Sequence, residues 1–173
     1  LDDAAISIPF LKWSKLPGKD GFAELEIDFQ KGRMAEIRGY RIAADGLHSS
    51  GSAIFAEDGE TIESLLLNKL ALGERTNISG TVERLSDGSF EIALHGSQLD
   101  LAPYFDDEND NAGPSKAIAL RGRGTFDKIW VGSETAVENV DVDVEHEGQS
   151  WRRVSLNGNI AKGKKFSADY VNE

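Results

Sequence analysis

Apolar and polar residues alternate along most of the chain. The pattern is plainest at residues 22–29, where Leu25, Ile27 and Phe29 share one parity and acidic residues take the other, and it returns at residues 140–145. A period of two is typical of β-strands with one buried face and one solvated face. The chain is therefore predicted to be almost entirely β.

Short turn signals divide the alternating runs. The pairs Asp45-Gly46, Asp58-Gly59 and Asp87-Gly88 favour tight turns between neighbouring strands. Sequential strands joined by short turns predict a long antiparallel meander with one apolar face. Pro9 cannot donate to a ladder, so the first strand is predicted to lie at an edge or to bend there. The expected strands cover residues 4–13, 22–29, 34–44, 47–56, 61–72, 77–85, 89–95, 118–120, 126–131, 140–145, 151–160 and 166–170.

Residues 61–72 are ambiguous, because their apolar side chains also fit a helical stripe and are good helix formers. We favour a strand with Leu65 and Leu67 on its apolar face. Leu70 continues that face after a slip of one residue at Asn68-Lys69. The slip predicts a β-bulge, which bends a sheet and increases its twist.

Length and charge restrict the remaining possibilities. The 173 residues suffice to bury a core without disulfides, so we expect one domain over residues 1–173. Both ends stop in or just after a strand pattern, which leads us to expect an excised segment of a longer protein. Residues 106–116 are acidic and without periodicity, so a mobile surface loop is expected there. The net charge of −11 argues against a nucleic-acid partner.

No catalytic or metal-binding signature stands out. His48, His95 and His146 fall on different expected strands without metal-site spacing, and there is no cysteine. The acidic run 106–110 lacks the glycine and the final glutamate of a calcium loop, and no Gly-x-Ser-x-Gly elbow occurs. Gly122-Arg123-Gly124 indicates a bulged strand better than a dinucleotide site. We therefore expect no enzyme, no cofactor and no metal.

The order of strand and turn motifs resembles the β-rich periplasmic region of the AsmA-like family of bacterial envelope proteins. The resemblance covers most of the chain and rests on strand-and-turn patterns, without invariant chemistry. The chain departs from the family in being short, in lacking the anchoring helix and in its acidic loop. The motifs are Ala5–Pro9 running to Trp13 and Pro17-Gly18, Gly46-Leu47 and Gly51 before Asp58-Gly59, Leu70–Gly73 before Ile78–Gly80, and Gly96–Pro103.

The resemblance implies a strongly curved, taco-like sheet whose apolar inner face carries phospholipid acyl chains. It also implies a periplasmic location within an inner-membrane-anchored protein, with adjoining β segments of the parent chain as neighbours and outer-membrane homeostasis as the role. Contact with the membrane would come only through the anchor of the parent chain. The candidate groove-lining residues are Leu25, Ile27, Phe29, Ile54, Leu65, Leu67, Leu70, Leu72, Phe90, Ile92, Leu94, Val140, Val142 and Val144.

Two alternatives stay open from the sequence. The same apolar rows also fit an ordinary sealed core, and both descriptions hold if only part of the face is covered. The other alternative is a secreted β-sandwich module that binds glycan or protein, in which Trp13, Trp130 or Trp151 would stack on sugars.

Overall fold

The computed structural model describes residues 5–105, 119–147, 150–160 and 163–172. The acidic loop expected at 106–116 lies outside these residues. The described part is almost entirely β, as the alternation predicts, and none of its helices is long and apolar enough to cross a membrane.

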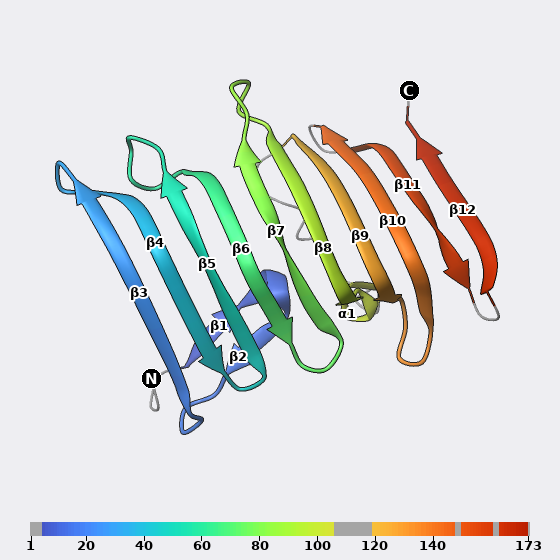
Figure 1. The fold of residues 1–173 in the computed structure, drawn as a ribbon, viewed down its shortest axis with the longest axis horizontal. Helices are drawn as coiled ribbons and strands as arrows, with labels where there is room; N and C mark the ends of the chain where they lie inside the picture. Colours follow the sequence, from blue (N-terminus) through green and yellow to red (C-terminus); the bar gives the residue numbers. More distant parts are fainter. Residues whose placement is uncertain (1–4, 106–118, 148–149, 161–162, 173) are drawn as a thin grey trace.

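Ten strands form a single sheet in which every strand pairs with its neighbours in the sequence (Figure 1). Because β3 and β12 are the two ends of this order, the sheet is open. It does not show the strong curl of the expected taco. The strands are β3 (Gly21–Gln30), β4 (Arg33–Ala44), β5 (Leu47–Phe55), β6 (Ile62–Leu72), β7 (Thr76–Arg84), β8 (Phe90–Asp100), β9 (Leu120–Trp130), β10 (Ala136–Glu147), β11 (Ser150–Ile160) and β12 (Lys164–Val171).

One pair breaks the expected antiparallel meander. Strands β8 and β9 run parallel, with Phe90 opposite Leu120 and Asp100 opposite Trp130. The chain between them begins with the short helix α1 (Ala102–Phe105) and returns to the end of the sheet where β8 begins. A parallel pair needs such a long connection, whereas hairpin turns join the antiparallel strands.

The ambiguous segment 61–72 forms a strand with the expected bulge. In the pairing of β6 with β7, the register shifts between Leu67 and Leu70, and the same place is irregular in the pairing with β5. Asn68 and Lys69 together lie opposite the single residue Ser79, so β6 has one extra residue here and the leucines on both sides of the slip share one face. The prediction of a strand with a bulge is confirmed, and the helical alternative is wrong.

The N-terminal segment leaves the sheet and folds behind it. Strand β1 (Ile6–Ile8), the 3₁₀ turn η1 (Pro9–Leu11) and strand β2 (Trp13–Lys15) form a small hairpin of their own. The predicted bend at Pro9 is confirmed, since Pro9 opens the 3₁₀ turn. Figure 1 shows β1, β2 and α1 behind one end of the sheet. We call this end the covered end, and the opposite end of the strands the open end.

Candidate apolar binding face

The pairing register places nearly all the candidate lining residues on one face of the sheet. Leu65 pairs with Val82, and Val82 pairs with Ile92, so these side chains form a row across β6, β7 and β8. The same face continues across β10 through Val144, whose partner on β9 is Gly122.

Ile54 is the exception among the candidates. It pairs with Glu36 on one side and Ser64 on the other, next to the buried Ala53, and therefore lies on the polar face. Half of its side chain is exposed, at 49%. Its assignment to the groove is wrong because side chains of consecutive strand residues point to opposite faces.

At the covered end, this face forms the core of the protein. Leu47 and Val140 are each 1% exposed, and Trp13 from β2 packs against the same cluster. The indole Nε1 of Trp13 donates a hydrogen bond to the backbone oxygen of Asp45 at 3.1 Å, which fastens the hairpin to the β4–β5 turn. Six candidates belong to this core or pack against it: Leu67, Leu70, Leu72, Leu94, Val140 and Val142.

A glycine makes room for an aromatic ring in this core. A Cβ atom on Gly124 would lie 2.5 Å from Cε2 of Phe126, so the ring folds back over the glycine. The register of β9 is regular on both sides at this point. The expectation of a bulge at Gly122-Arg123-Gly124 is therefore wrong, and the glycines instead make space for neighbouring side chains.

Toward the open end, and along the edge strand β3, the same face lies outside the core cluster. Leu25 is 50%, Ile27 38% and Phe29 65% exposed, although all three have the parity of the apolar face. The inner strands there carry half-buried side chains that lie outside the core cluster. Seven candidates occupy this region: Leu25, Ile27, Phe29, Leu65, Phe90, Ile92 and Val144. We call them the open apolar strip.

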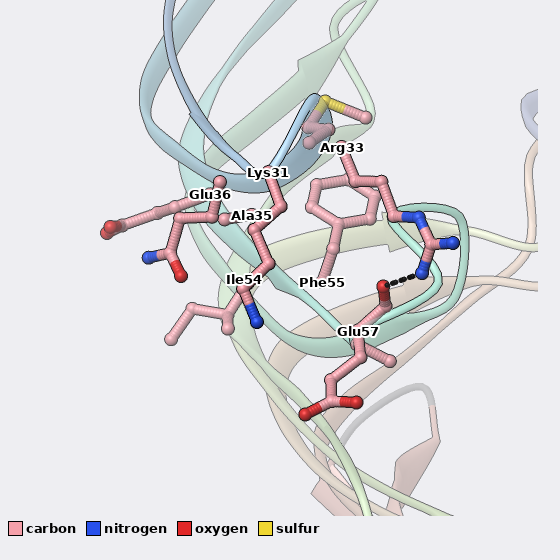
Figure 2. A pocket seen from close by; sticks show the side chains of 10 residues that line it. Lys31, Arg33, Ala35, Glu36, Ile54, Phe55 and Glu57 are labelled. Atoms are coloured by element: carbon pink, nitrogen blue, oxygen red, sulfur yellow. Dashed lines mark hydrogen bonds between the residues drawn. The ribbon is translucent and has the colours of Figure 1, made fainter.

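A hollow of about 520 Å³ lies at the open end, where β4 and β5 separate. Its lining combines apolar side chains such as Phe55 with two cations, Lys31 and Arg33, and two carboxylates, Glu36 and Glu57 (Figure 2). An Arg33 guanidinium nitrogen (Nη1) donates to the backbone oxygen of Glu57 at 3.0 Å and so bridges the two strand ends. Apolar and charged groups thus meet at one margin of the open end.

A second cavity, of about 610 Å³, lies at the covered end between the sheet and the segments behind it. Leu70, Ile78 and Leu99 are among its apolar lining. Its rim carries two cation–aromatic contacts: Arg75 lies 4.3 Å from the ring centroid of Trp130, and Lys12 lies 5.1 Å from that of Tyr104.

Polar groups around this cavity are held by the segments that cover it. The Lys12 Nζ donates to the backbone oxygen of Pro103 at 2.7 Å and so ties η1 to α1. Burial raises the pKa of the Tyr104 hydroxyl above its usual value.

Charged residues concentrate on the opposite face in cross-strand rows. Arg123 of β9 reaches Glu91 of β8 at 2.6 Å, and Arg121 reaches Glu145 of β10 at 3.4 Å. On β4, Arg38 forms ion pairs with both Glu26 and Asp28 of β3. The hydrogen bond from Arg38 to Asp28 and the nearby negative charge hold the pKa of that guanidinium above its ordinary value.

The turns of the open end carry strongly hydrogen-bonded aspartates. Asp58 accepts from the hydroxyl of Thr61 at 2.6 Å and from the backbone N–H groups of Thr61 and Glu60 at 2.8 Å each. These bonds lower the pKa of Asp58 to about 2. Asp87 accepts from the hydroxyl and the backbone N–H of Ser89, and its pKa is lowered for the same reason.

The described residues show no arrangement that indicates a metal centre. No group of three or more histidine, aspartate or glutamate side chains within them is placed to hold a metal ion. His95 has a partner in the hydroxyl of Ser79, with 3.0 Å between Oγ and Nε2, on the exposed polar face. His48 and His146 lie on the separate strands β5 and β10.

The tryptophans differ in exposure. Trp13 is buried, Trp130 is half-buried, and Trp151 is exposed at 46% and packs edge-on against His146. The described strands form one large sheet and one small hairpin. They do not form the two packed sheets of the alternative sandwich.

Sequence reasoning missed the segment that divides the apolar face. Ile6, Ile8 and Leu11 pack against the core from behind the sheet together with Trp13. Their alternation indicated one more strand of the meander. The dense turn signals at Pro9 and Pro17-Gly18 were the available sign that this segment could turn away.

Comparisons with known proteins give no relative. No family model matches the sequence, and neither the search of curated proteins nor that of solved structures found a match.

Proposed function

We propose that the open apolar strip binds the acyl chains of a phospholipid, and that the chain is a non-catalytic β segment of a periplasmic lipid-transport protein of the AsmA-like kind. The observation that carries this proposal is a single apolar face that is sealed at one end and exposed at the other. In the proposal, the protein is held at the inner membrane by an anchor of the parent chain and serves outer-membrane homeostasis.

The apolar side chains form a continuous surface across neighbouring strands. Neighbouring strands lie about 4.8 Å apart, so apolar side chains at every second residue make a strip across the strands. An acyl chain on this strip would bury apolar area at about 25 cal/mol per Å² without precise polar contacts. Exposed apolar patches of this kind are typical of binding surfaces.

Adjoining β segments of the parent chain would extend the sheet at the β12 edge. In this proposal, a longer sheet of this kind curls into the taco-like trough, with the apolar strip on its inner side.

The chain offers a matched pair of isoleucines for the test. Ile27 lies on the strip and Ile54 on the polar face, and both are exposed. A fluorescently labelled phosphatidylethanolamine is titrated into the wild type, Ile27→Asp and Ile54→Asp. We expect Ile27→Asp to weaken binding at least fivefold and Ile54→Asp to leave it within twofold.

A photo-crosslinking amino acid at position 92 or 54 supplies a second readout. Lipid adducts detected by mass spectrometry are expected from position 92 and not from position 54. Equal weakening by both aspartates, or equal crosslinking from both positions, would show that the strip is not the binding surface. Protein that binds no acyl probe at all would refute the proposal.

A further inference from the structure

The first strand of the sheet has an open edge. Among the described strands, β3 has a hydrogen-bonded neighbour on one side only, and Figure 1 shows β3 at the margin of the sheet. The chain that precedes β3 turns behind the sheet as β1 and β2 instead of running along this edge. An edge strand presents a row of backbone N–H and C=O groups that can pair with another strand.

Strand β3 lacks several of the usual protections of an edge strand. Its ten residues, GFAELEIDFQ, contain no proline and no lysine, and its charged side chains are all acidic. The pairing with β4 has two register shifts, but the extra residues, Arg38 and Ala35, lie on β4. Strand β3 itself therefore stays free of bulges and is a regular template for a further strand.

The side chains of β3 define what such a strand must carry. Glu24, Glu26 and Asp28 form a row of carboxylates on the polar face, and the apolar residues between them belong to the open apolar strip. Arg38 and Arg41 of β4 lie beside this row on its inner side. On the outer side, no described strand supplies a balancing charge.

In the interior of the sheet, some charged side chains on the polar face are paired with opposite charges on neighbouring strands. The arginines of β9 alternate with glycines, and each has one glutamate partner on a neighbouring strand: Arg121 pairs with Glu145 of β10 and Arg123 with Glu91 of β8. Opposite charges across neighbouring strands are stabilising, whereas like charges directly opposite are destabilising. The β3 strand of a second copy is thus a poor partner, because it would bring a second row of carboxylates. Strand β12 of a second copy is also poor, because its polar face carries one cation, Lys165, and an acidic residue, Asp169.

We propose that the outer edge of β3 binds, by strand addition, an extended segment of another chain in which lysine or arginine alternates with apolar residues. Its basic side chains would face Glu24, Glu26 and Asp28, and its apolar side chains would continue the open apolar strip. Main-chain hydrogen bonds supply affinity in this mode of recognition, and the alternating side chains supply specificity. The inference does not depend on lipid binding.

The test uses two labelled octapeptides with blocked ends, (Lys-Val)₄ and (Glu-Val)₄, in fluorescence anisotropy with the whole chain. We expect the basic peptide to bind at least tenfold more tightly than the acidic one, and the difference to shrink as salt rises. The variant Glu24→Lys/Glu26→Lys should reverse the preference. The matched control, Glu83→Lys/Asp141→Lys, makes the same charge change on the interior strands β7 and β10, where neither residue lies opposite a cation, and should stay within twofold of the wild type.

Two further measurements separate strand addition from simple attraction. Methylating every second backbone nitrogen of (Lys-Val)₄ keeps its charge but removes half of its N–H donors. There are two such peptides, one for each alternating set of nitrogens. The peptide whose methylated set faces β3 should bind at least tenfold more weakly than the parent peptide. Binding by both sets equal to that of the parent peptide would overturn the proposal, as would equal binding of the two peptides or equal effects of the two charge reversals. Sedimentation showing a dimer that Glu24→Lys/Glu26→Lys dissolves would also overturn it, because the occupant would be a second copy.

The same variant tests strand addition and lipid binding separately. The labelled phosphatidylethanolamine should bind Glu24→Lys/Glu26→Lys as it binds the wild type, because the substituted side chains lie on the polar face.

Discussion

The core and the open apolar strip follow the same alternation on one face but meet different surroundings. At the covered end, Leu47 is enclosed by Trp13 and its neighbours, whereas Leu25 on the edge strand β3 keeps half of its side chain in solvent. Both are leucines on the same face of one sheet. The difference shows that strand periodicity fixes which way a side chain points, while the covering segment and the place of the strand in the sheet decide whether it is buried.

This division also limits what can be functional. At the covered end, most side chains of the face are occupied by packing, and the cavity beside them is enclosed by the covering segments as well as by the sheet. Side chains of the open apolar strip can bind a ligand without giving up existing packing contacts, because they are in contact with water. The open apolar strip and the neighbouring edge of β3 are therefore the places where a partner can gain the most.

The largest difference between the core and the open apolar strip should appear on removing a leucine side chain. Leu47→Ala leaves a cavity in the core and should lower the free energy of unfolding by about 3 kcal/mol. Leu25→Ala removes a half-exposed side chain and should cost less than about 1 kcal/mol. Urea unfolding followed by circular dichroism gives both values.

Similar losses at the two positions would mean that Leu25 is covered in solution. In that case, the open apolar strip would be part of a sealed core, and its proposed role in binding would fall with it.

A smaller effect should follow when the hairpin is loosened from the β4–β5 turn. Trp13→Phe keeps most of the apolar contact but removes the donor to the backbone oxygen of Asp45, so it should cost about 1–2 kcal/mol. Trp151→Phe changes an exposed ring and should stay within about 0.5 kcal/mol of the wild type. Hydrogen exchange of the Leu47 and Leu70 amides is the local readout, and protection there should fall only in Trp13→Phe.

Local patterns in the sequence account for most of the sheet. The alternation at 22–29 and 140–145, the Asp45-Gly46 turn and the slip at Asn68-Lys69 each predict what the structure shows, because every one depends on neighbouring residues alone. Positive φ angles of 39° at Asp45 and 81° at Gly46 are those of the tight turn expected there. The position of Ile54 was predictable too, since its parity differs from that of Leu47.

Long-range features could not be obtained in this way. The parallel pairing of β8 with β9 depends on where the chain returns after α1, and the cover behind the sheet depends on contacts such as that between Trp13 and Asp45, 32 residues apart. The split of the apolar face into a core and an open strip follows from that cover. The sequence pattern thus identifies the face, but not which of its leucines and valines remain free for a ligand.

The smallest expected effect concerns acid stability and the turns of the open end. The folded-state pKa of Asp58 is about 2, below the ordinary 3.8, because Thr61 and Glu60 donate to the carboxylate. A carboxyl group with a lowered pKa stabilises the fold above about pH 4, and this contribution is lost as the pH falls through 2.

Asp58→Asn should therefore lower the urea midpoint at pH 5, and the difference in midpoint between the variant and the wild type should disappear toward pH 2. Hydrogen exchange at residues 58–62 should report the same loss locally while the Leu47 amide at the covered end stays protected. A gap that is constant down to pH 2, or a simultaneous loss at both ends, would contradict the assignment of this acid sensitivity to the open end.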